Sequence, residues 1–215
     1  MLPKLVIFDV DGTLLDTEAR WQEAWEVIGN KHGVPNLGVD LFLKCVGKSG
    51  KEEQLFIQNY LKQAGAPENI LQEANAYGLQ LLEERIDVKP GAFELLDQLK
   101  ALNIKLGVAT ATRKEWTIER LIRCGLIDYF DYILCGDQVT KRKPDPETYL
   151  KVLEYFNIDA KDALVLEDSL VGVEAAYRAG IPCIMIPDLV PAGEKQEKEA
   201  IAILKTLHDV VPMIG

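Results

Sequence analysis

The stretch Leu5-Val-Ile-Phe-Asp-Val-Asp-Gly-Thr13 joins a continuous apolar run to a polar cluster. A strand that is buried on both faces has such a run, so we predict a central strand of a parallel sheet over residues 5–8. Asp9 alone would fit a turn or a helix cap. The four fixed residues of Asp9-x-Asp-Gly-Thr13 together arise by chance in about one chain of this length in several hundred, at ~5–7% usage per residue type. This rarity indicates a functional cluster.

Four further apolar runs follow, and helical patterns separate them. Such an alternation predicts an α/β fold with a doubly wound, Rossmann-like parallel sheet covered on both faces. The run at residues 181–186 contains Pro182 and is followed by Pro187, so we expect it to be an outer strand. The other runs cover residues 104–109, 132–134 and 163–166, and the helical patterns cover residues 93–99, 115–124, 145–156 and 171–179.

One long segment, residues 16–86, breaks this alternation. It carries helical patterns and no convincing strand, including a capping-box pattern at Ser49-Gly-Lys-Glu52 that would open a helix. The segment is too long for a crossover between two strands. We therefore predict two domains: an α/β catalytic core of residues 1–15 and 87–215, and an inserted helical lid, or cap, of residues 16–86.

Polar clusters follow three of the predicted strands. Asp9 and Asp11 follow the first, Thr110 follows the second, and the pair Glu167-Asp168 follows the fourth. The C-terminal ends of parallel strands share one edge of a sheet, where ligands bind, so we expect these side chains to meet. Converging carboxylates repel one another unless some are protonated or a cation lies among them. Oxygen ligands of this kind favour Mg²⁺.

Lys143 is the cation that the sequence places most firmly. It precedes Pro144-Asp-Pro146, which restricts the backbone and opens a helix. That arrangement would hold one ammonium group near the strand ends. A lysine is a point charge suited to a phosphate oxygen or a carboxylate.

The composition excludes several classes of function. The chain has 24 basic and 34 acidic residues in 215, and its net charge of −10 disfavours binding to nucleic acid or to an anionic membrane surface. No apolar run is long enough for a transmembrane helix, and the N-terminus has no signal-peptide pattern. The four cysteines form no C-x-x-C pair, which fits a reducing compartment. We expect a cytoplasmic protein and leave its oligomeric state open, a monomer included.

Four motifs contain these residues: Asp9-Val-Asp-Gly-Thr-Leu-Leu-Asp-Thr17, Val108-Ala-Thr-Ala-Thr112, Arg142-Lys-Pro-Asp-Pro-Glu147 and Leu166-Glu-Asp-Ser-Leu-Val-Gly-Val-Glu-Ala-Ala176. In order and spacing they resemble the four signatures of the haloacid dehalogenase-like hydrolase superfamily. The helical insert resembles the lid of its β-phosphoglucomutase-like and phosphoglycolate-phosphatase-like branch. Many relatives carry Asp at the position of Glu147, and we expect this departure to leave the chemistry unchanged.

The resemblance implies a Mg²⁺-dependent phosphatase acting on a small organic phosphate, a sugar phosphate or a similar metabolite. Asp9 would attack phosphorus to form an aspartyl-phosphate, and Asp11 would act first as acid and then as base. The implied ligands of Mg²⁺ are the Asp9 carboxylate, the Asp11 main-chain carbonyl and Asp168, with Glu167 nearby as a candidate further ligand. The implied phosphoryl contacts are Thr110, the Ala111 amide and Lys143.

A sugar-phosphate mutase of the β-phosphoglucomutase type stays open as the alternative. The resemblance places Trp21 where such a mutase has a histidine. The lid arginine of the mutase corresponds to Gly50 in this chain, and Lys48 and Lys51 flank that position. By position alone, the lid candidates for substrate contact are Arg20, Trp21, Lys48 and Lys51.

Other chemistries are disfavoured by single residues. Dehalogenases of the superfamily lack the second aspartate of the first motif, and Asp11 is present here. Ser-His or Cys-His catalysis is disfavoured because the only histidines, His32 and His208, lie outside the clusters. A non-catalytic binding protein is disfavoured because every catalytic group that the resemblance implies is in place.

Overall fold

The computed structural model describes residues 2–45 and 50–214, and the chain folds as two compact units. We call Met1–Leu15 with Asp87–Gly215 the core unit, and Asp16–Ile86 the helical unit. The chain leaves the core unit after Leu15 and returns at Asp87. Leu15 pairs with Val88 in an antiparallel bridge, so these two connections lie side by side within the core unit.

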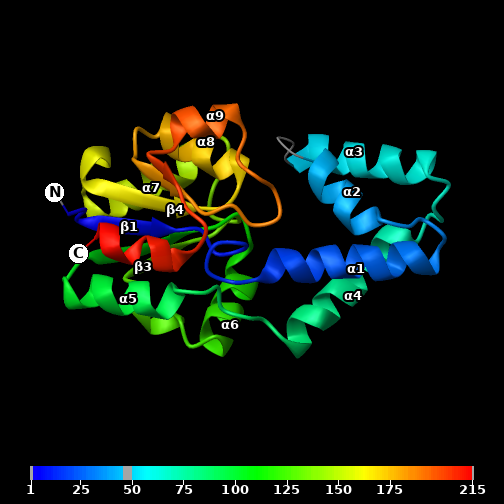
Figure 1. The fold of residues 1–215 in the computed structure, drawn as a ribbon, viewed down its shortest axis with the longest axis horizontal. Coiled ribbons are helices and arrows are strands. Elements are labelled where there is room, and N and C mark those ends of the chain that lie inside the picture. The colour runs from blue at the N-terminus through cyan, green and yellow to red at the C-terminus, as the bar shows by residue number, and fades with distance from the viewer. Residues whose placement is uncertain (1, 46–49, 215) are drawn as a thin grey trace. The chain divides into compact units, whose positions relative to one another are not determined.

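The core unit contains a parallel sheet of six strands in the order β3-β2-β1-β4-β5-β6 (Figure 1). This arrangement confirms the predicted α/β class. In chain order the strands are β1 (Leu5–Phe8), β2 (Lys105–Ala109), β3 (Tyr132–Leu134), β4 (Ala163–Glu167), β5 (Cys183–Met185) and β6 (Ala202–Ile203). All four residues of β1 are fully buried, as the apolar run predicts.

The register of β1 brings three strand ends together. Phe8 is the partner of Val108 on β2 and of Leu166 on β4. The residues that follow these positions therefore lie at one edge of the sheet.

The strand β5 pairs with β6, which corrects the expectation that residues 181–186 form an outer strand. The two residues of β6 are too few to give a recognisable apolar run.

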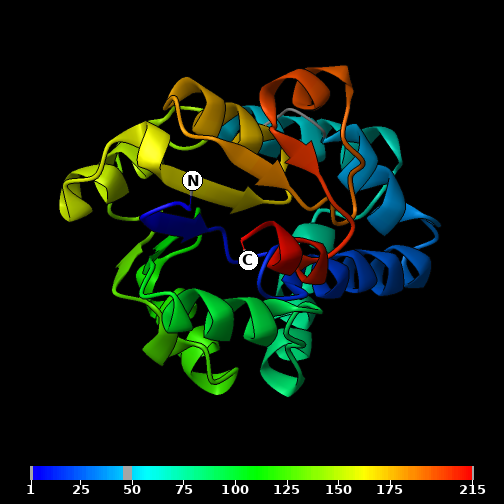
Figure 2. The same ribbon diagram turned by 60° about the vertical axis from the view of Figure 1, so that its left-hand side comes forward.

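Helices cover both faces of this sheet. Figure 1 shows α7, α8 and α9 on one side and α5 and α6 on the other, and Figure 2 shows the same two layers from a second direction. Side chains of α7 and α8, among them Val152 and Val173, pack in one apolar cluster with Leu5 and Ile7 of β1. The helices are α5 (Ala92–Ala101), α6 (Lys114–Arg123), α7 (Glu147–Phe156), α8 (Leu170–Arg178) and α9 (Glu194–Glu199).

The helical unit has its own apolar core, in which Trp25, Leu37 and Ile70 are buried together. Its described residues contain no strand, and α2 is a helix that the sequence analysis does not distinguish. Its helices are α1 (Thr17–Lys31), α2 (Leu37–Lys44), α3 (Gly50–Gln63) and α4 (Ile70–Glu84). Ser49, the predicted cap of α3, lies outside the described residues. No helix in the described part of the chain has the length and apolarity needed to cross a membrane.

Candidate active site

The loop after β1 is shaped around Asp168. Gly12 has a φ of +85°, and a Cβ at this position would overlap the Asp168 carboxylate. The position therefore requires glycine both for its backbone conformation and for the close approach. The buried hydroxyl of Thr13 donates a hydrogen bond of 2.8 Å to Oδ1 of Asp168. The first and fourth motifs are thus fitted to each other directly, and Asp9 follows immediately on β1, with its N–H bonded to the Leu166 carbonyl.

A buried ammonium group connects the first motif with the third and fourth. The Nζ atom of Lys143 donates to Oδ1 of Asp9 at 2.6 Å, to Oε1 of Glu167 at 2.7 Å and to the Ala109 carbonyl at 3.0 Å. An ammonium group has three N–H donors, so these acceptors occupy all of them. A contact between Lys143 and a phosphoryl oxygen would have to share or replace one of these bonds.

The carboxylate of Glu167 is fully buried and surrounded by donors. Its Oε1 accepts from Lys143 and from the Tyr149 hydroxyl at 3.1 Å, and its Oε2 accepts from the Ser169 N–H at 2.7 Å and the Ser169 hydroxyl at 2.9 Å. Four donors fill the roughly four lone-pair sites of a carboxylate. This geometry pairs Glu167 with Lys143, and its role as a further metal ligand stays a prediction. Gly172 is needed beside it, because a Cβ there would overlap Glu167.

Burial raises the pKa of Asp9 from 3.8 to about 7. The positive charge of Lys143 opposes this rise, while the negative charges of Glu167 and Asp11 add to it. For Lys143 itself, burial lowers the pKa, but Asp9 and Glu167 outweigh burial and raise it above the ordinary value. Lys143 therefore stays charged, and Asp9 near neutral pH is poised between its protonated and ionised forms when no metal is bound.

The side chain of Asp11 is held by the segment after β2. Its Oδ1 lies 3.0 Å from Nη1 of Arg120, and its Oδ2 accepts the Thr112 hydroxyl at 2.7 Å. The Thr110 hydroxyl lies 3.5 Å from the same oxygen. The sequence analysis missed Arg120 and Thr112. The signal in the sequence was the position of Arg120 on α6. It lies on the same side of this helix as Thr117 and Leu121, which are both buried.

Thr110 and Ala111, the predicted phosphate contacts, follow β2 directly. The Thr110 side chain is buried, and its hydroxyl oxygen accepts the N–H of Thr112 at 3.1 Å. Ala111 is exposed. Gly136 approaches it so closely that a Cβ would overlap the Ala111 carbonyl. This turn therefore packs against the loop after β3.

Glu147 holds the loop that precedes Lys143, although the sequence analysis gave it no role. Its carboxylate accepts the N–H groups of Thr140 and Lys141, both at 2.8 Å. Lys151 pairs with the same carboxylate, and these contacts lower the pKa of Glu147 to about 2. They tie down the loop that leads into Lys143. The helix α7 begins at Glu147, within the predicted range of residues 145–156, with Pro146 at its cap.

The donor set of the site fits Mg²⁺. Mg²⁺ is usually held by one or two carboxylates and otherwise by waters and substrate phosphate. Asp9 and Asp168 are buried acidic side chains at neighbouring strand ends, and the Asp11 carbonyl lies in the loop fitted against Asp168. Within residues 2–45 and 50–214, no three His, Cys, Asp or Glu side chains gather as a metal cluster.

Two of the predicted lid residues, Arg20 and Trp21, contact other residues of the helical unit. Nη1 of Arg20 lies 2.9 Å from Glu23. The six-membered ring of Trp21 lies where a Cβ of Gly78 on α4 would be. Lys48 lies outside the described residues, and Lys51 is in the first turn of α3.

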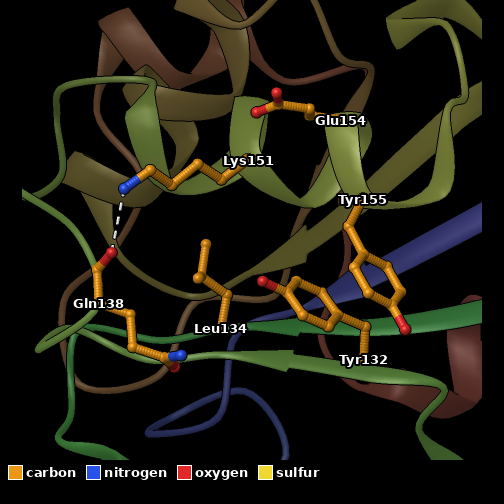
Figure 3. Close-up of a pocket in the computed structure, with 6 residues that line it drawn as sticks. All are labelled: Tyr132, Leu134, Gln138, Lys151, Glu154 and Tyr155. Atoms are coloured by element: carbon orange, nitrogen blue, oxygen red, sulfur yellow. Dashed lines mark hydrogen bonds between the residues drawn. The ribbon is translucent and has the colours of Figure 1, made fainter.

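A pocket lies between β3 and α7 (Figure 3). The rings of Tyr132 and Tyr155 stack at 3.8 Å on one side of it, and Lys151 donates to the Gln138 carbonyl on the other. Leu134 and Glu154 complete its lining. None of these six residues belongs to the four motifs.

Comparison with known proteins agrees with this geometry. A family described as "Haloacid dehalogenase-like hydrolase" matches residues 6–186. The "Phosphorylated carbohydrates phosphatase" of Thermotoga maritima is 37% identical over 202 residues, 93% of each chain. The "Validoxylamine A 7'-phosphate phosphatase" of Streptomyces hygroscopicus subsp. limoneus is 33% identical over 99% of this chain and 98% of that one. The crystal structure of a "putative beta-phosphoglucomutase from Thermotoga maritima" has a TM-score of 0.79 at 32% identity, covering 98% of this chain and 97% of the other.

Proposed function

The chain belongs to the haloacid dehalogenase-like hydrolase family and is a phosphatase of that family, and we propose that it hydrolyses a sugar phosphate or similar small metabolite with Mg²⁺ through an aspartyl-phosphate on Asp9. The observation that carries the proposal is the contact between Lys143 and Asp9 at the end of the central strand. It holds a buried carboxylate in place and partly offsets its charge, as attack on an anionic phosphoryl group requires.

In the first step, an oxygen of Asp9 forms a bond to phosphorus while the bond from phosphorus to the leaving oxygen breaks. Asp11 gives a proton to that oxygen, so the product leaves as an alcohol. In the second step, Asp11 takes a proton from water as the water oxygen attacks phosphorus. The bond between phosphorus and Asp9 breaks, and inorganic phosphate and the free carboxylate result.

The remaining residues bind and orient. Thr110 and the Ala111 amide donate to phosphoryl oxygens, and Lys143 offsets the charge on Asp9. Bound Mg²⁺, held by Asp9, Asp168 and the Asp11 carbonyl, would neutralise charge on the nucleophile and the phosphoryl group. We propose that the helical unit acts as a lid that limits the access of water and carries the substrate specificity.

A panel of phosphorylated metabolites, assayed for phosphate release with Mg²⁺, tests this function. We expect turnover of one or more sugar phosphates, with Asp9→Asn inactive on the same panel. The Thermotoga maritima relative, named for phosphorylated carbohydrates, supports sugar phosphates as the first compounds to try. Failure of every phosphate monoester, in a protein shown to be folded, would contradict the proposal.

A sugar-phosphate mutase is the second candidate, favoured by the similarity to the Thermotoga maritima structure. A mutase must protect its aspartyl-phosphate from water until the sugar has turned over. The resemblance places Trp21 at the position of a mutase histidine. The indole of Trp21 acts neither as an acid nor as a base near neutral pH. Given β-glucose 1-phosphate and a trace of the 1,6-bisphosphate, we expect phosphate release to exceed glucose 6-phosphate formation. A coupled dehydrogenase assay run beside a phosphate assay measures both, and the reverse result would favour the mutase.

A further inference from the structure

Arg120 is a buried charge that the chemistry above does not use. It lies on α6, and only 6% of its side chain is exposed. Burial of a guanidinium group is unfavourable unless an anion and hydrogen-bond acceptors compensate it. Its Nη1 atom lies 3.0 Å from Oδ1 of Asp11, a contact between residues 109 positions apart in the chain. The pair is therefore a specific tertiary contact.

The helix fixes the direction from which Arg120 approaches. Thr117, Arg120 and Leu121 form the buried stripe of α6. The Thr117 hydroxyl bonds back to the Arg113 carbonyl at 3.0 Å, which secures the first turn. Arg123, one turn further on, is more exposed and pairs with Glu119 of the same helix. The two arginines of this helix thus contact different parts of the chain: Arg123 pairs within α6, and Arg120 contacts Asp11 in the loop after β1.

The other oxygen of Asp11 is also engaged, by the Thr112 hydroxyl at 2.7 Å. A carboxylate turns about a soft torsion angle, so donors on both oxygens define its plane. Proton transfer needs the carboxyl group within hydrogen-bond reach of the leaving oxygen, and a misplacement of about 1 Å can cost about 100-fold in rate.

We infer that Arg120 is a positioning residue that orients the carboxylate of Asp11 for proton transfer to the leaving group. This inference rests on the role proposed for Asp11. Arg120 touches neither the phosphoryl group nor its leaving oxygen in this scheme, and it acts through Asp11 alone. Its loss should therefore slow the step that needs a proton and leave the binding of phosphate unchanged.

The test compares two substrates that need a proton to different extents. p-Nitrophenyl phosphate has a good leaving group, and phenyl phosphate has a poorer one that depends more on the acid. For Arg120→Met we expect kcat/KM for phenyl phosphate to fall about 10- to 100-fold, the range of a misplaced catalytic group. The fall for p-nitrophenyl phosphate should be at least threefold smaller, and inhibition by inorganic phosphate should stay within about twofold of wild type.

Two further variants make the result decisive. Arg123→Met, on the same helix, should keep the wild-type ratio of the two kcat/KM values. Arg120→Lys keeps a charge but loses the planar fork, so its ratio should move in the same direction by less. If circular dichroism shows that Arg120→Met is unfolded, Arg120→Lys takes its place in the test. Equal losses on both substrates, weakened phosphate inhibition or wild-type rates would overturn the inference.

A reference variant separates this inference from the proposed function. Asp11→Asn should change the ratio of the two kcat/KM values at least as strongly as Arg120→Met. If Asp11→Asn keeps wild-type rates, the proposed function itself fails. If Asp11→Asn is impaired and both Arg120 variants keep the wild-type ratio, the proposed function stands and Arg120 has no part in it.

Discussion

The ammonium nitrogen of Lys143 lies 2.6 Å from Oδ1 of Asp9, although the two residues are 134 positions apart in the chain. The same nitrogen lies 2.7 Å from Glu167, so one cation is shared by two buried carboxylates. Around this cation the loop before α7, the end of β1 and the end of β4 are held together. The proposed nucleophile is thus fixed by contacts that also stabilise the core unit.

Removal of the charge of Lys143 should affect both stability and activity. Lys143→Met leaves two buried carboxylates without their cation, and loss of one partner from a buried pair costs about 3–5 kcal/mol. We expect a decrease of this order in the free energy of unfolding, measured with urea, and loss of phosphatase activity. Lys141→Met, two residues earlier and largely exposed, is the matched control and should change neither. Equal stability of the two variants would contradict the shared-cation arrangement.

The stability of the metal-free protein should depend on pH through Asp9. Its pKa is about 7 in the folded protein and near 3.8 unfolded. The folded state thus holds a proton that the unfolded chain releases. This contribution is complete below about pH 4 and is lost as the pH rises to 7, by about 1.4 kcal/mol per pH unit.

Asp9→Asn isolates this effect, because an amide does not titrate. We expect the free energy of unfolding of wild type, relative to Asp9→Asn, to decrease between pH 5 and pH 7 and to level off above pH 7. Urea unfolding of both proteins in EDTA measures the difference. A difference that is constant over this range would mean that Asp9 has no raised pKa.

The hydroxyl of Tyr149 should support Glu167. Its oxygen lies 3.1 Å from Oε1 of Glu167, and its ring centroid lies 4.9 Å from the Lys143 nitrogen. Tyr149→Phe keeps the ring and removes one hydrogen bond, a loss of about 1 kcal/mol in stability. We expect kcat to fall by less than about tenfold, which corresponds to ~1.4 kcal/mol in the barrier. Tyr155→Phe, which alters an exposed hydroxyl on the same helix, should match wild type in both measurements.

Metal removal should abolish activity reversibly. We expect no phosphate release in excess EDTA and recovery when Mg²⁺ is restored. Excess Ca²⁺ should inhibit, because Ca²⁺ takes a larger and looser ligand shell and would misplace Asp9. A steady-state phosphate assay over a titration of each ion measures this. Full activity in EDTA, in protein shown to be metal-free, would exclude the metal role.

Much of the core unit follows from local patterns. The apolar runs of β1 and β4 are signals that a single segment carries. The outer strand β6 has only two residues and depends on its pairing with β5, so no local pattern marks it. The helix α2 is likewise defined by packing within the helical unit, where Leu37 and Leu41 are buried.

In the candidate site, too, some contacts follow from the sequence pattern and others depend on packing. The nearness of Asp9 and Glu167, which share the Lys143 ammonium group, follows from parallel strands that end at one edge. The partners of Glu167 depend on the rotation of α7, which turns Tyr149 inward, and on the turn that brings Ser169 back to it. The contact of Arg120 with Asp11 likewise depends on the rotation of α6. Such rotations are set by packing, which a single sequence does not show.

The most direct test of the central claim is detection of the phosphoryl group on Asp9. Wild-type protein turning over a good substrate with Mg²⁺ is quenched in acid, digested and analysed by mass spectrometry. We predict one added phosphoryl group on the peptide that contains Asp9, and none on that peptide from Asp9→Asn, which should release no phosphate. Phosphate release at the wild-type rate by correctly folded Asp9→Asn would contradict the covalent mechanism.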